Sequence, residues 1–333
     1  MFQNILDWLA CPHCSSDLVL TDTKKTQDGE IIEGQLTCQA CKVTFPIRNG
    51  IPRFAGHEKS DFENFGYQWN RWGQVQIDRL SNHRLSEQRL LAETDWGAEW
   101  FQDKIILDGG SGAGRFSDVA AGFGGHIIAV DISQAIDACR ENLSIHGDRV
   151  HCIQASLFKL PLKKEILDGA FSLGVIQHTP EPEKVITSMV RHLKPGGKLA
   201  VNFYEKNFST KLQPIKYALR LFTPRLRSET LLSLCRAFVR VFFPLSYTVR
   251  NIRKVRLLSH FLPICSVHNP ELTKDQQRAW TLLDTFDWYG PKYELRQSHV
   301  RLGALLEELK LSDIRARPGV MQATRPLDKI NRP

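Results

Sequence analysis

The sequence of 333 residues predicts an α/β fold, a doubly wound, mostly parallel sheet with a small unit before it and a helical insertion inside it. Three observations lead to this prediction. A short apolar run, Ile105–Leu107, continues directly into a glycine-rich loop and then a helical pattern. Apolar runs and helical patterns alternate from there to residue 205. Two C-x-x-C pairs precede this region, in a turn-rich stretch too short to bury a core of its own.

The N-terminal unit, residues 1–57, is predicted to bind zinc. The pair Cys11 and Cys14 is separated by 23 residues from the pair Cys38 and Cys41, which leaves room for a short hairpin. Four thiolates can surround one tetrahedral zinc ion, and the metal then replaces the missing apolar core. A redox pair, the other interpretation, would need a thioredoxin-like βαβ setting that this stretch lacks. Four cysteine ligands leave zinc no open position, so we expect a structural role in packing or docking.

A longer stretch around these cysteines has a known relative. With the segment Phe45–Pro52 that follows the second pair, residues 6–54 resemble a zinc-ribbon family whose free-standing members activate partner methyltransferases of RNA and protein. The next segment, residues 58–103, is predicted to form a helical arm. Its aromatic-rich part, Phe65–Trp72, is expected to lie over the cleft of the core, where its aromatic side chains pack.

The charge of the chain is concentrated in one segment. The net charge is +8, but residues 206–260 hold twelve lysines and arginines against one acid, so that segment carries +11 and the remainder −3. A membrane surface or phosphate groups are the anionic partners that such a segment favours. No signal segment precedes the cysteines, and no run approaches the roughly 18 uninterrupted apolar residues of a spanning helix. We therefore expect a cytoplasmic protein, peripheral at the membrane if the basic segment binds lipid.

The glycine-rich loop predicts a nucleotide-like cofactor. Asp108 ends the first strand and Gly110, Gly112 and Gly114 follow, so the backbone can approach a ligand closely at the start of a helix. The next strand, His126–Asp131, ends in an acid 23 residues after Asp108, where a carboxylate can accept the hydrogen bonds of ribose hydroxyls. A dinucleotide fingerprint would need glycine where the chain has Arg115, which argues against NAD.

The remaining elements complete a recognisable pattern. Strands are predicted at Val150–Gln154, Asp168–Gly174 and Leu199–Tyr204, with a helix at Val185–Leu193. Residues 104–205 resemble the class I, Rossmann-like S-adenosyl-methionine-dependent methyltransferases, closest to their small-molecule and lipid-directed branch. The resemblance implies that Asp108, Gly110, Gly112 and Gly114 line the methionine and ribose side of the cofactor. It also implies that Asp131 takes the ribose, that Ile132 contacts the adenine, and that the turn with Ser156 and Leu157 lies at the adenine edge. Many members have Asp where this chain has Ser156, so cofactor affinity could be lower.

Methyl transfer from a sulfonium needs alignment more than reactive side chains. His178, after the fourth strand, lies where ligands of such sheets bind. It is either a general base for a hydroxyl acceptor or a residue that orients the loop over the cofactor. The Asn/Asp-Pro-Pro-aromatic motif that cradles exocyclic amines is absent, because the chain reads Leu173-Gly174-Val175-Ile176 there. Its absence lowers the case for base N-methylation.

The segment before the C-terminus predicts an insertion and a completed sheet. Residues 297–325 supply the helix and two strands that finish the core with residues 104–205, so residues 206–296 form an inserted lid beside the cleft. Apolar clusters alternate there with basic residues, as in membrane-surface helices, although a helical cap with a solvated basic face fits the same pattern. Substrate candidates near its end are Asp287, Tyr289, Tyr293 and His299, unless the aromatic residues only fix the lid in place.

The sequence therefore predicts an S-adenosyl-methionine-dependent methyltransferase with structural zinc. The expected acceptor is a small-molecule, glycan or lipid-linked compound, methylated on oxygen or carbon. Two alternatives remain open: an RNA methyltransferase that uses the ribbon and the basic insertion for phosphate contacts, or a non-catalytic partner that activates another methyltransferase.

Overall fold

The computed structural model describes the chain except residues 28, 56–62, 207–212, 251–260 and 328–333. At its N-terminus, a four-stranded antiparallel sheet follows a 3-10 turn, Gln3–Asp7. Its strands are β1 (Leu18–Gln27), β2 (Glu30–Cys38), β3 (Thr44–Arg48) and β4 (Ile51–Pro52), in that order. The hairpin of β1 and β2 is longer than the short one that the sequence predicts. We call residues 1–55 of this unit the ribbon.

The core is a seven-stranded sheet in the order β10-β11-β9-β8-β5-β6-β7. The strands are β5 (Ile105–Gly109), β6 (His126–Asp131), β7 (Val150–Gln154), β8 (Leu167–Ser172), β9 (Leu193–Asn202), β10 (Ser312–Arg317) and β11 (Val320–Thr324). Strands β5 to β9 pair in parallel, whereas β11 is antiparallel to both its neighbours. The order reverses between β5 and β8, which is where open α/β sheets bind ligands. The predicted Rossmann-like α/β fold is confirmed.

Helices cover both faces of this sheet. On one face lie α3 (Leu85–Thr94), α4 (Arg115–Gly122) and α5 (Ala135–Leu143), which contribute Leu90, Phe116 and Cys139 to one buried cluster. On the other face lie α6 (Pro182–Val190) and α10 (His299–Glu308), through Val185 and Leu302. The predicted helix at 185–193 thus starts and ends three residues earlier, and β9 begins at Leu193 instead of 199.

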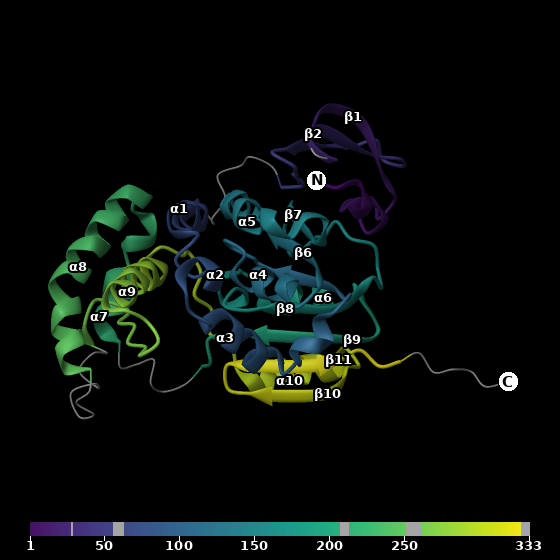
Figure 1. Ribbon diagram of the computed structural model, residues 1–333. Helices are drawn as coiled ribbons and strands as arrows, with labels where there is room; N and C mark the ends of the chain where they lie inside the picture. The colour runs from purple at the N-terminus through teal and green to yellow at the C-terminus, as the bar shows by residue number, and fades with distance from the viewer. Residues whose placement is uncertain (28, 56–62, 207–212, 251–260, 328–333) are drawn as a thin grey trace.

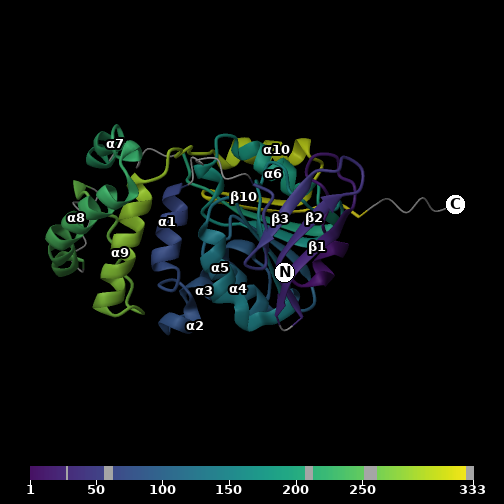
Figure 2. The same ribbon diagram turned by 90° about the horizontal axis from the view of Figure 1, so that it is seen from above.

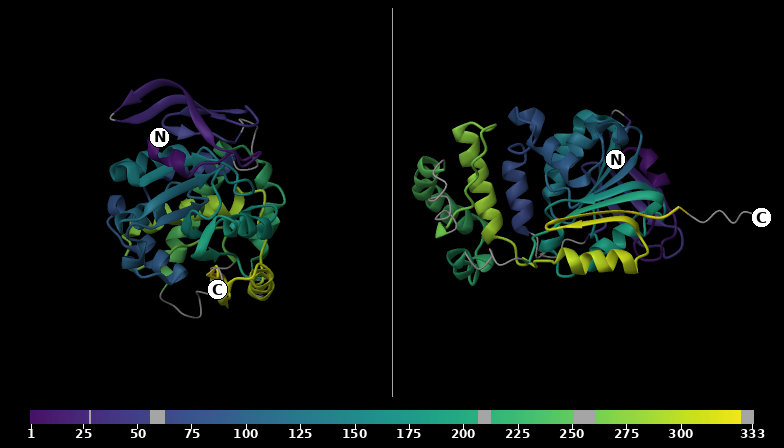
Figure 3. Two further views of the ribbon diagram at one scale, coloured as in Figure 1. Left: turned by 90° about the vertical axis from the view of Figure 1, so that its right-hand side faces the viewer. Right: turned by 90° about the horizontal axis from the view of Figure 1, so that it is seen from below.

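The ribbon occupies the remaining part of the second face, above β6 and β7 (Figure 1). The connection from β7 to β8, residues 155–166, contains no helix, so no element of the core itself covers these strands on that side. Ribbon residues Ile5, Leu36 and Ile47 instead share one buried cluster with Val130 and Ile153 of the sheet. The view from the side shows the same stacking of ribbon upon core (Figure 3). The ribbon therefore covers the strands that a crossover helix would otherwise cover.

The other helices form a layered block at the carboxyl ends of the parallel strands. The arm gives α1 (Glu63–Trp72) and α2 (Asp78–Ser81), and the insertion gives α7 (Pro214–Arg220), α8 (Ser228–Val249) and α9 (Lys274–Tyr289). Helix α1 lies between the sheet and α9, and α8 lies outside α9 (Figures 2 and 3). Apolar side chains of α8 and α9, among them Leu231, Leu232 and Phe286, pack together with Tyr67 and Trp72 of α1.

A buried charge cluster fastens the insertion to the core. Glu294 bonds the ammonium group of Lys216 at 2.8 Å, and the two side chains are 5 % and 3 % exposed. Arg220 lies 3.7 Å from the same carboxylate and donates to the carbonyls of Trp288 and Pro291. The insertion returns to the core where Glu205 pairs with Gln297. Two of the twelve basic residues between 206 and 260 therefore form ion pairs inside the molecule and are not available to an anionic partner.

Helix α8 is an exception to the prediction that no segment is long and apolar enough to span a membrane. Its 22 residues are long and apolar enough to do so by length and composition, and 28 % of the relevant window is buried. The count of uninterrupted apolar residues missed this helix because single arginines and serines interrupt it. The finding concerns length and composition alone, since a packed helix can pass the same test.

Candidate functional site

One cavity of about 290 Å³ lies at the carboxyl ends of β5, β6 and β8, under α1 and α9. Its floor is the predicted loop, with Gly110, Ser111 and Gly112, and its roof includes Phe65, Gln68 and Trp69 of α1. This position is the switch point of the strand order. The fold therefore brings together segments that are far apart in the sequence.

The conformation of the loop explains two of its glycines. Gly110 has φ of 85°, and a Cβ atom there would lie 2.4 Å from the side chain of Val175. Gly112 has φ of 54°, and a Cβ atom would lie 3.1 Å from the indole nitrogen of Trp69. Both φ values lie in the left-handed region that favours glycine. Larger residues at these positions would occupy the space in which a ligand approaches the backbone.

Asp131 is held rigidly at the edge of this cavity. Its Oδ2 accepts the backbone N–H of Gly112 at 3.0 Å, and its Oδ1 accepts both the N–H and the hydroxyl of Ser133, at 2.8 and 2.7 Å. Burial raises the pKa of this carboxyl above its ordinary value, while these hydrogen bonds oppose the rise. Oδ2 keeps a lone pair for a further donor, which suits a ribose hydroxyl, whereas Oδ1 already accepts two hydrogen bonds.

The predicted adenine residues lie beside Asp131. Ile132, Ser156 and Leu157 all line the cavity. The Ser156 hydroxyl accepts the backbone N–H of Phe158 at 3.2 Å, so it stabilises its own turn. Two apolar side chains with one hydroxyl between them match a flat heteroaromatic ring with a polar edge.

Two of the predicted cofactor residues lie behind the loop and do not line the cavity. Asp108 is 2 % exposed and accepts the hydroxyl of Ser117 at 2.7 Å. Burial raises the pKa of its carboxyl to about 7. Gly114 precedes α4 with φ of 88°, and a Cβ atom there would clash with Leu143. Both residues support the shape of the loop from the side of the core.

His178 lines the cavity and has a fixed orientation. Its Nδ1 is 3.0 Å from the carbonyl oxygen of Tyr293, and because a carbonyl only accepts, Nδ1 carries the hydrogen. In the neutral ring Nε2 is then free to accept a proton. The ring also contacts those of Phe65 and Tyr204, with centroids 5.4 and 5.6 Å away. Both roles that the sequence leaves open are compatible with this geometry, because His178 joins the loop to the lid through Nδ1 and keeps Nε2 unbonded.

A carboxylate of α9 faces this nitrogen. Oδ2 of Asp287 lies 3.9 Å from Nε2 of His178, beyond hydrogen-bond length but close enough to stabilise a positive ring. Asp284, one turn earlier on α9, lines the same cavity. Burial, with the charge of Asp287, raises the pKa of Asp284 to about 7. No hydrogen bond to the Asp284 carboxylate is found within the described residues.

The other three predicted substrate residues do not line the cavity. Tyr289 is fully buried between α8 and α9, and its hydroxyl donates to the carbonyl of Pro263 at 3.2 Å. Tyr293 contributes its backbone carbonyl to His178. His299 begins α10, where its Nδ1 lies 3.1 Å from Glu205. Of the four, Asp287 and, through its backbone, Tyr293 take part in the site.

Several cavity residues were not singled out from the sequence as ligand-binding. Arg115 donates to Gln76 and Ser86 at 2.8 and 3.2 Å, and burial lowers its pKa to about 9. The amide nitrogen of Gln68 has no partner among the described residues, although the side chain is 1 % exposed and lines the cavity. The position of Arg115 directly after the third glycine could have indicated a ligand contact. Asp284 begins the stretch rich in acids and aromatic residues from which the substrate candidates come, whereas no sequence signal singles out Gln68.

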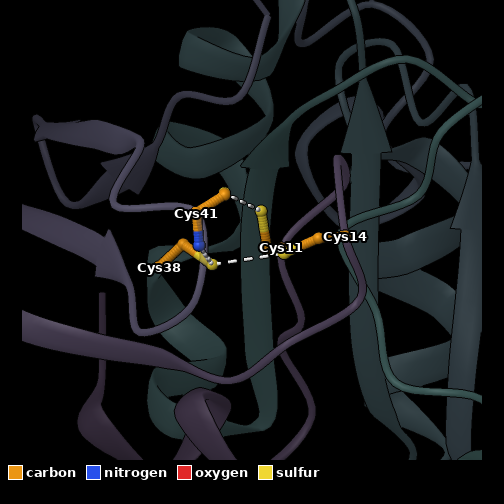
Figure 4. A group of neighbouring side chains, drawn as sticks. All are labelled: Cys11, Cys14, Cys38 and Cys41. Atoms are coloured by element: carbon orange, nitrogen blue, oxygen red, sulfur yellow. Dashed lines mark hydrogen bonds between the residues drawn. The ribbon is translucent and has the colours of Figure 1, made fainter.

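The four ribbon cysteines meet as predicted (Figure 4). Their sulfur atoms lie within 4.8 Å of one another, with Cys11 to Cys41 at 3.6 Å and Cys14 to Cys38 at 3.4 Å. Sulfur atoms bound to one tetrahedral zinc are roughly 3.8 Å apart, given a Zn–S bond of about 2.3 Å. The backbone N–H of Cys41 points to Cys38 Sγ at 3.4 Å, as in a knuckle around a metal. The donor set and its spacing fit structural zinc.

Comparisons with known families agree with this geometry. Residues 107–201 match the methyltransferase domain family, and residues 4–50 match the Trm112p-like protein family. The core is a methyltransferase domain. It is of the S-adenosyl-methionine-dependent class, and the ribbon before it is a Trm112p-like domain.

Similar proteins with assigned functions match part of this chain. The chain is 26 % identical to a ubiquinone biosynthesis O-methyltransferase of Dechloromonas aromatica, over 45 % of this chain and 65 % of that one. It is 32 % identical to the ubiquinone/menaquinone biosynthesis C-methyltransferase of Vibrio campbellii, over 33 % of this chain and 44 % of that one. The chain thus spans less than two thirds of both relatives.

Solved structures show weaker similarity. A complex of the Haloferax volcanii Trm112 methyltransferase activator with a methyltransferase covers 43 % of this chain and 62 % of that one, at 21 % identity and a TM-score of 0.35. Magnesium protoporphyrin IX methyltransferase of Synechocystis covers 79 % of this chain and 95 % of that one, at 13 % identity and a TM-score of 0.42.

Proposed function

We propose that the chain transfers the methyl group of S-adenosyl-methionine to an oxygen or carbon atom of a small-molecule, glycan or lipid-linked acceptor. The observation that carries the proposal is the lining of one cavity by the glycine loop and Asp131 together with the pair His178 and Asp287. When bound, the cofactor supplies a methyl group already activated by its positively charged sulfur. The protein then has to align the acceptor and remove one proton.

In this proposal the cofactor lies along the loop. Oδ2 of Asp131 accepts a ribose hydroxyl, Ile132 and Leu157 contact the faces of the adenine, and Ser156 lies at its edge. The backbone of Gly110 and Gly112 borders the methionine part. Asp108 and Gly114 hold the loop in shape from behind, which replaces the direct contact that the resemblance implies.

Arg115 is a cation on the cavity wall that can bind the carboxylate of the methionine part. It lies at the start of α4 on the cavity wall, and its guanidinium bonds only neutral groups, Gln76 and Ser86, in the described structure. A buried guanidinium without a bound carboxylate is costly, and its lowered pKa reflects this cost. A carboxylate bound in the cavity would offset this cost by pairing with the guanidinium.

His178 acts as the base for the acceptor. An acceptor hydroxyl donates to Nε2, its oxygen forms the bond to the methyl carbon while the carbon–sulfur bond breaks, and the proton remains on Nε2. Asp287 then stabilises the imidazolium from 3.9 Å. Tyr293 holds the required tautomer through its carbonyl, so a mobile histidine is avoided.

The shape of the acceptor end favours a small reacting group. It is enclosed by α1 and α9, and its aromatic side chains, Phe65, Tyr204 and Trp288, suit a flat or apolar compound. Asp284 and the unpaired amide of Gln68 offer hydrogen bonds to a polar substituent. The names of the quinone-pathway relatives support the same class of acceptor. RNA is less favoured, because Lys216 and Arg220 of the basic segment already bind Glu294.

Labelled S-adenosyl-methionine and cell extract test the proposal. After incubation with the purified chain, label is counted in lipid, small-molecule, RNA and protein fractions. We expect label in the lipid or small-molecule fraction, lost with Asp131→Ala and with His178→Gln, and retained with Asp148→Ala, which changes an exposed acid away from the cavity. Label in RNA would support the alternative acceptor. Cofactor binding without label in any fraction would support a non-catalytic activator.

A further inference from the structure

The outermost surface of the insertion is the face of α8 that points away from α9 (Figures 1 and 2). The residues buried against α9 include Leu232, Cys235 and Val239, which recur at helical spacing. The opposite face exposes Ala237, Val241, Pro244, Leu245 and Thr248, at spacings of three or four residues. We call these five residues the outer face of α8.

This face is unusually apolar for a surface. Val241 is 65 % exposed and Leu245 is 54 % exposed. Within the described residues, six of the twelve exposed large apolar side chains lie between residues 213 and 261. Two of the six, Val241 and Leu245, lie on α8 itself, one helical turn apart. Exposed apolar residues that gather on one part of a surface mark a contact with a partner.

Arginines border the outer face on one side. Arg236 and Arg240 are exposed, one and three positions from Ala237 on the helix. Arg225 and Arg227, just before α8, are exposed as well, and Glu229 is the only acid between residues 213 and 250. Unlike Lys216 and Arg220, the two arginines of the helix have no carboxylate within salt-bridge distance among the described residues. Their charge therefore faces solvent.

We infer that the outer face of α8 binds the surface of an anionic lipid bilayer, with the helix lying parallel to the membrane. An apolar strip bordered by arginines fits the boundary between acyl chains and headgroups, where long basic side chains extend toward the phosphates. Charge complementarity selects this occupant, because a neutral surface would leave the arginines without partners. The inner face of α8 stays packed on α9, so the helix binds without leaving the fold.

The inference places the cavity near the bilayer. Helix α9 lies between α8 and the cavity and contributes Asp284, Asp287 and Trp288 to its wall. An acceptor dissolved in the membrane would reach the site over a short path. Membrane binding does not depend on the proposed methyl transfer, however, and it can be measured without any substrate.

Sedimentation with lipid vesicles tests the inference directly. The full chain is mixed with vesicles of phosphatidylcholine alone and with vesicles of equal parts phosphatidylcholine and phosphatidylglycerol. We expect binding to the second kind only, weakened by salt. Arg236→Glu with Arg240→Glu should lower the partition coefficient by about tenfold or more, and Val241→Asp with Leu245→Asp should lower it to a similar degree.

Matched controls come from exposed apolar residues elsewhere on the core. Ile145 is 70 % exposed and Val300 is 69 % exposed, and they lie outside the insertion, in the 3-10 segment Ser144–Arg149 and in α10. Ile145→Asp with Val300→Asp should bind vesicles like the unchanged chain. Unchanged melting temperatures would show that all variants fold. If the control pair lost vesicle binding to the same degree, the inference would be wrong, because acidic substitutions anywhere on the surface would then lower binding.

Other occupants of the outer face give different results. If the chain dimerises and the α8 substitutions make it monomeric, a second copy covers the face and the inference is wrong. RNA binding that the arginine substitutions abolish, without vesicle binding, would also overturn it. A spanning helix would resist extraction of membranes with alkaline carbonate, whereas a surface-bound helix is released.

Discussion

The guanidinium of Arg53, at the end of the ribbon, binds both oxygens of Asp137 on α5, at 2.6 and 3.2 Å. Its Nη1 also donates to the amide oxygen of Gln154 at 3.1 Å, and the amide nitrogen of Gln154 donates to the carbonyl of Ile132. Ile132 follows Asp131 at the proposed adenosine end of the cavity. One side chain of the ribbon thus connects it to the segment that is expected to hold the cofactor.

Arg53→Ala should weaken cofactor binding as well as the fold. Arg53 is 10 % exposed and Asp137 is 35 % exposed, so we expect a loss of about 1–3 kcal/mol of unfolding free energy, between the values for exposed and buried pairs. The dissociation constant for S-adenosyl-methionine, measured by calorimetry, should rise several-fold. Lys163→Ala is the control, because its pair with Asp17 also joins core and ribbon but both side chains are well exposed. Similar effects in both variants would contradict a specific role for Arg53.

Loss of zinc should destabilise the core as well as the ribbon. Cys38→Ser or a strong chelator removes a ligand or the metal, and the ribbon can no longer cover Val130 and Ile153. We expect a lower melting temperature and aggregation, with the bound zinc lost by elemental analysis. Cys235→Ala, at a buried cysteine between α8 and α9, should keep the zinc. A metal-free chain that melts like the untreated chain would disprove the structural role.

Stability should fall in acid partly because of His151. This side chain is buried against Trp8 and Phe2 of the ribbon, neither ring nitrogen has a partner within the described residues, and burial lowers its pKa to about 4. The unfolded chain binds the proton near pH 6.5, so between pH 6.5 and 4 it holds more protons than the folded chain, and folding weakens as the pH falls. The full loss is about 3 kcal/mol. Urea unfolding of His151→Phe should show a shallower pH dependence over this range, and an unchanged slope would rule the histidine out.

Glu294→Gln should loosen the lid. The substitution leaves Lys216 buried without a carboxylate, which costs about 3–5 kcal/mol in buried pairs. Since Glu294 lies outside the cavity wall, the affinity for S-adenosyl-methionine should change little while the KM for the acceptor rises. Glu308→Gln, at an exposed end of α10, serves as the control. A variant with normal acceptor KM and normal stability would refute this account of the cluster.

The sequence predicts the parts of the site that lie on one continuous segment. The zinc ligands and the glycine loop have fixed spacings. Asp131 ends one strand and His178 lies in the loop after another, so local sequence identifies them. Tyr289 shows where this reasoning stops. It lies two residues from Asp287, and two residues along a helix turn the side chain to nearly the opposite face, so a dense aromatic stretch does not reveal which residues meet the cavity.

Residues that depend on tertiary packing were harder to predict. Gln68 and Asp284 come from α1 and α9, which are more than two hundred residues apart and meet only because the insertion folds back over the arm. The composition predicts one basic surface, whereas Lys216 and Arg220 form ion pairs with Glu294 inside the molecule. Which charges reach solvent depends on partners that composition alone does not supply.

The missing helix between β7 and β8 has a consequence for assembly. A ribbon on a separate polypeptide would have to find this bare face by diffusion, and dilution would separate the two. Because ribbon and sheet belong to one chain, their docking is a unimolecular step governed by an effective concentration that the tether sets. Dilution should therefore leave the ribbon docked on the sheet, since each molecule brings its own cover for β6 and β7.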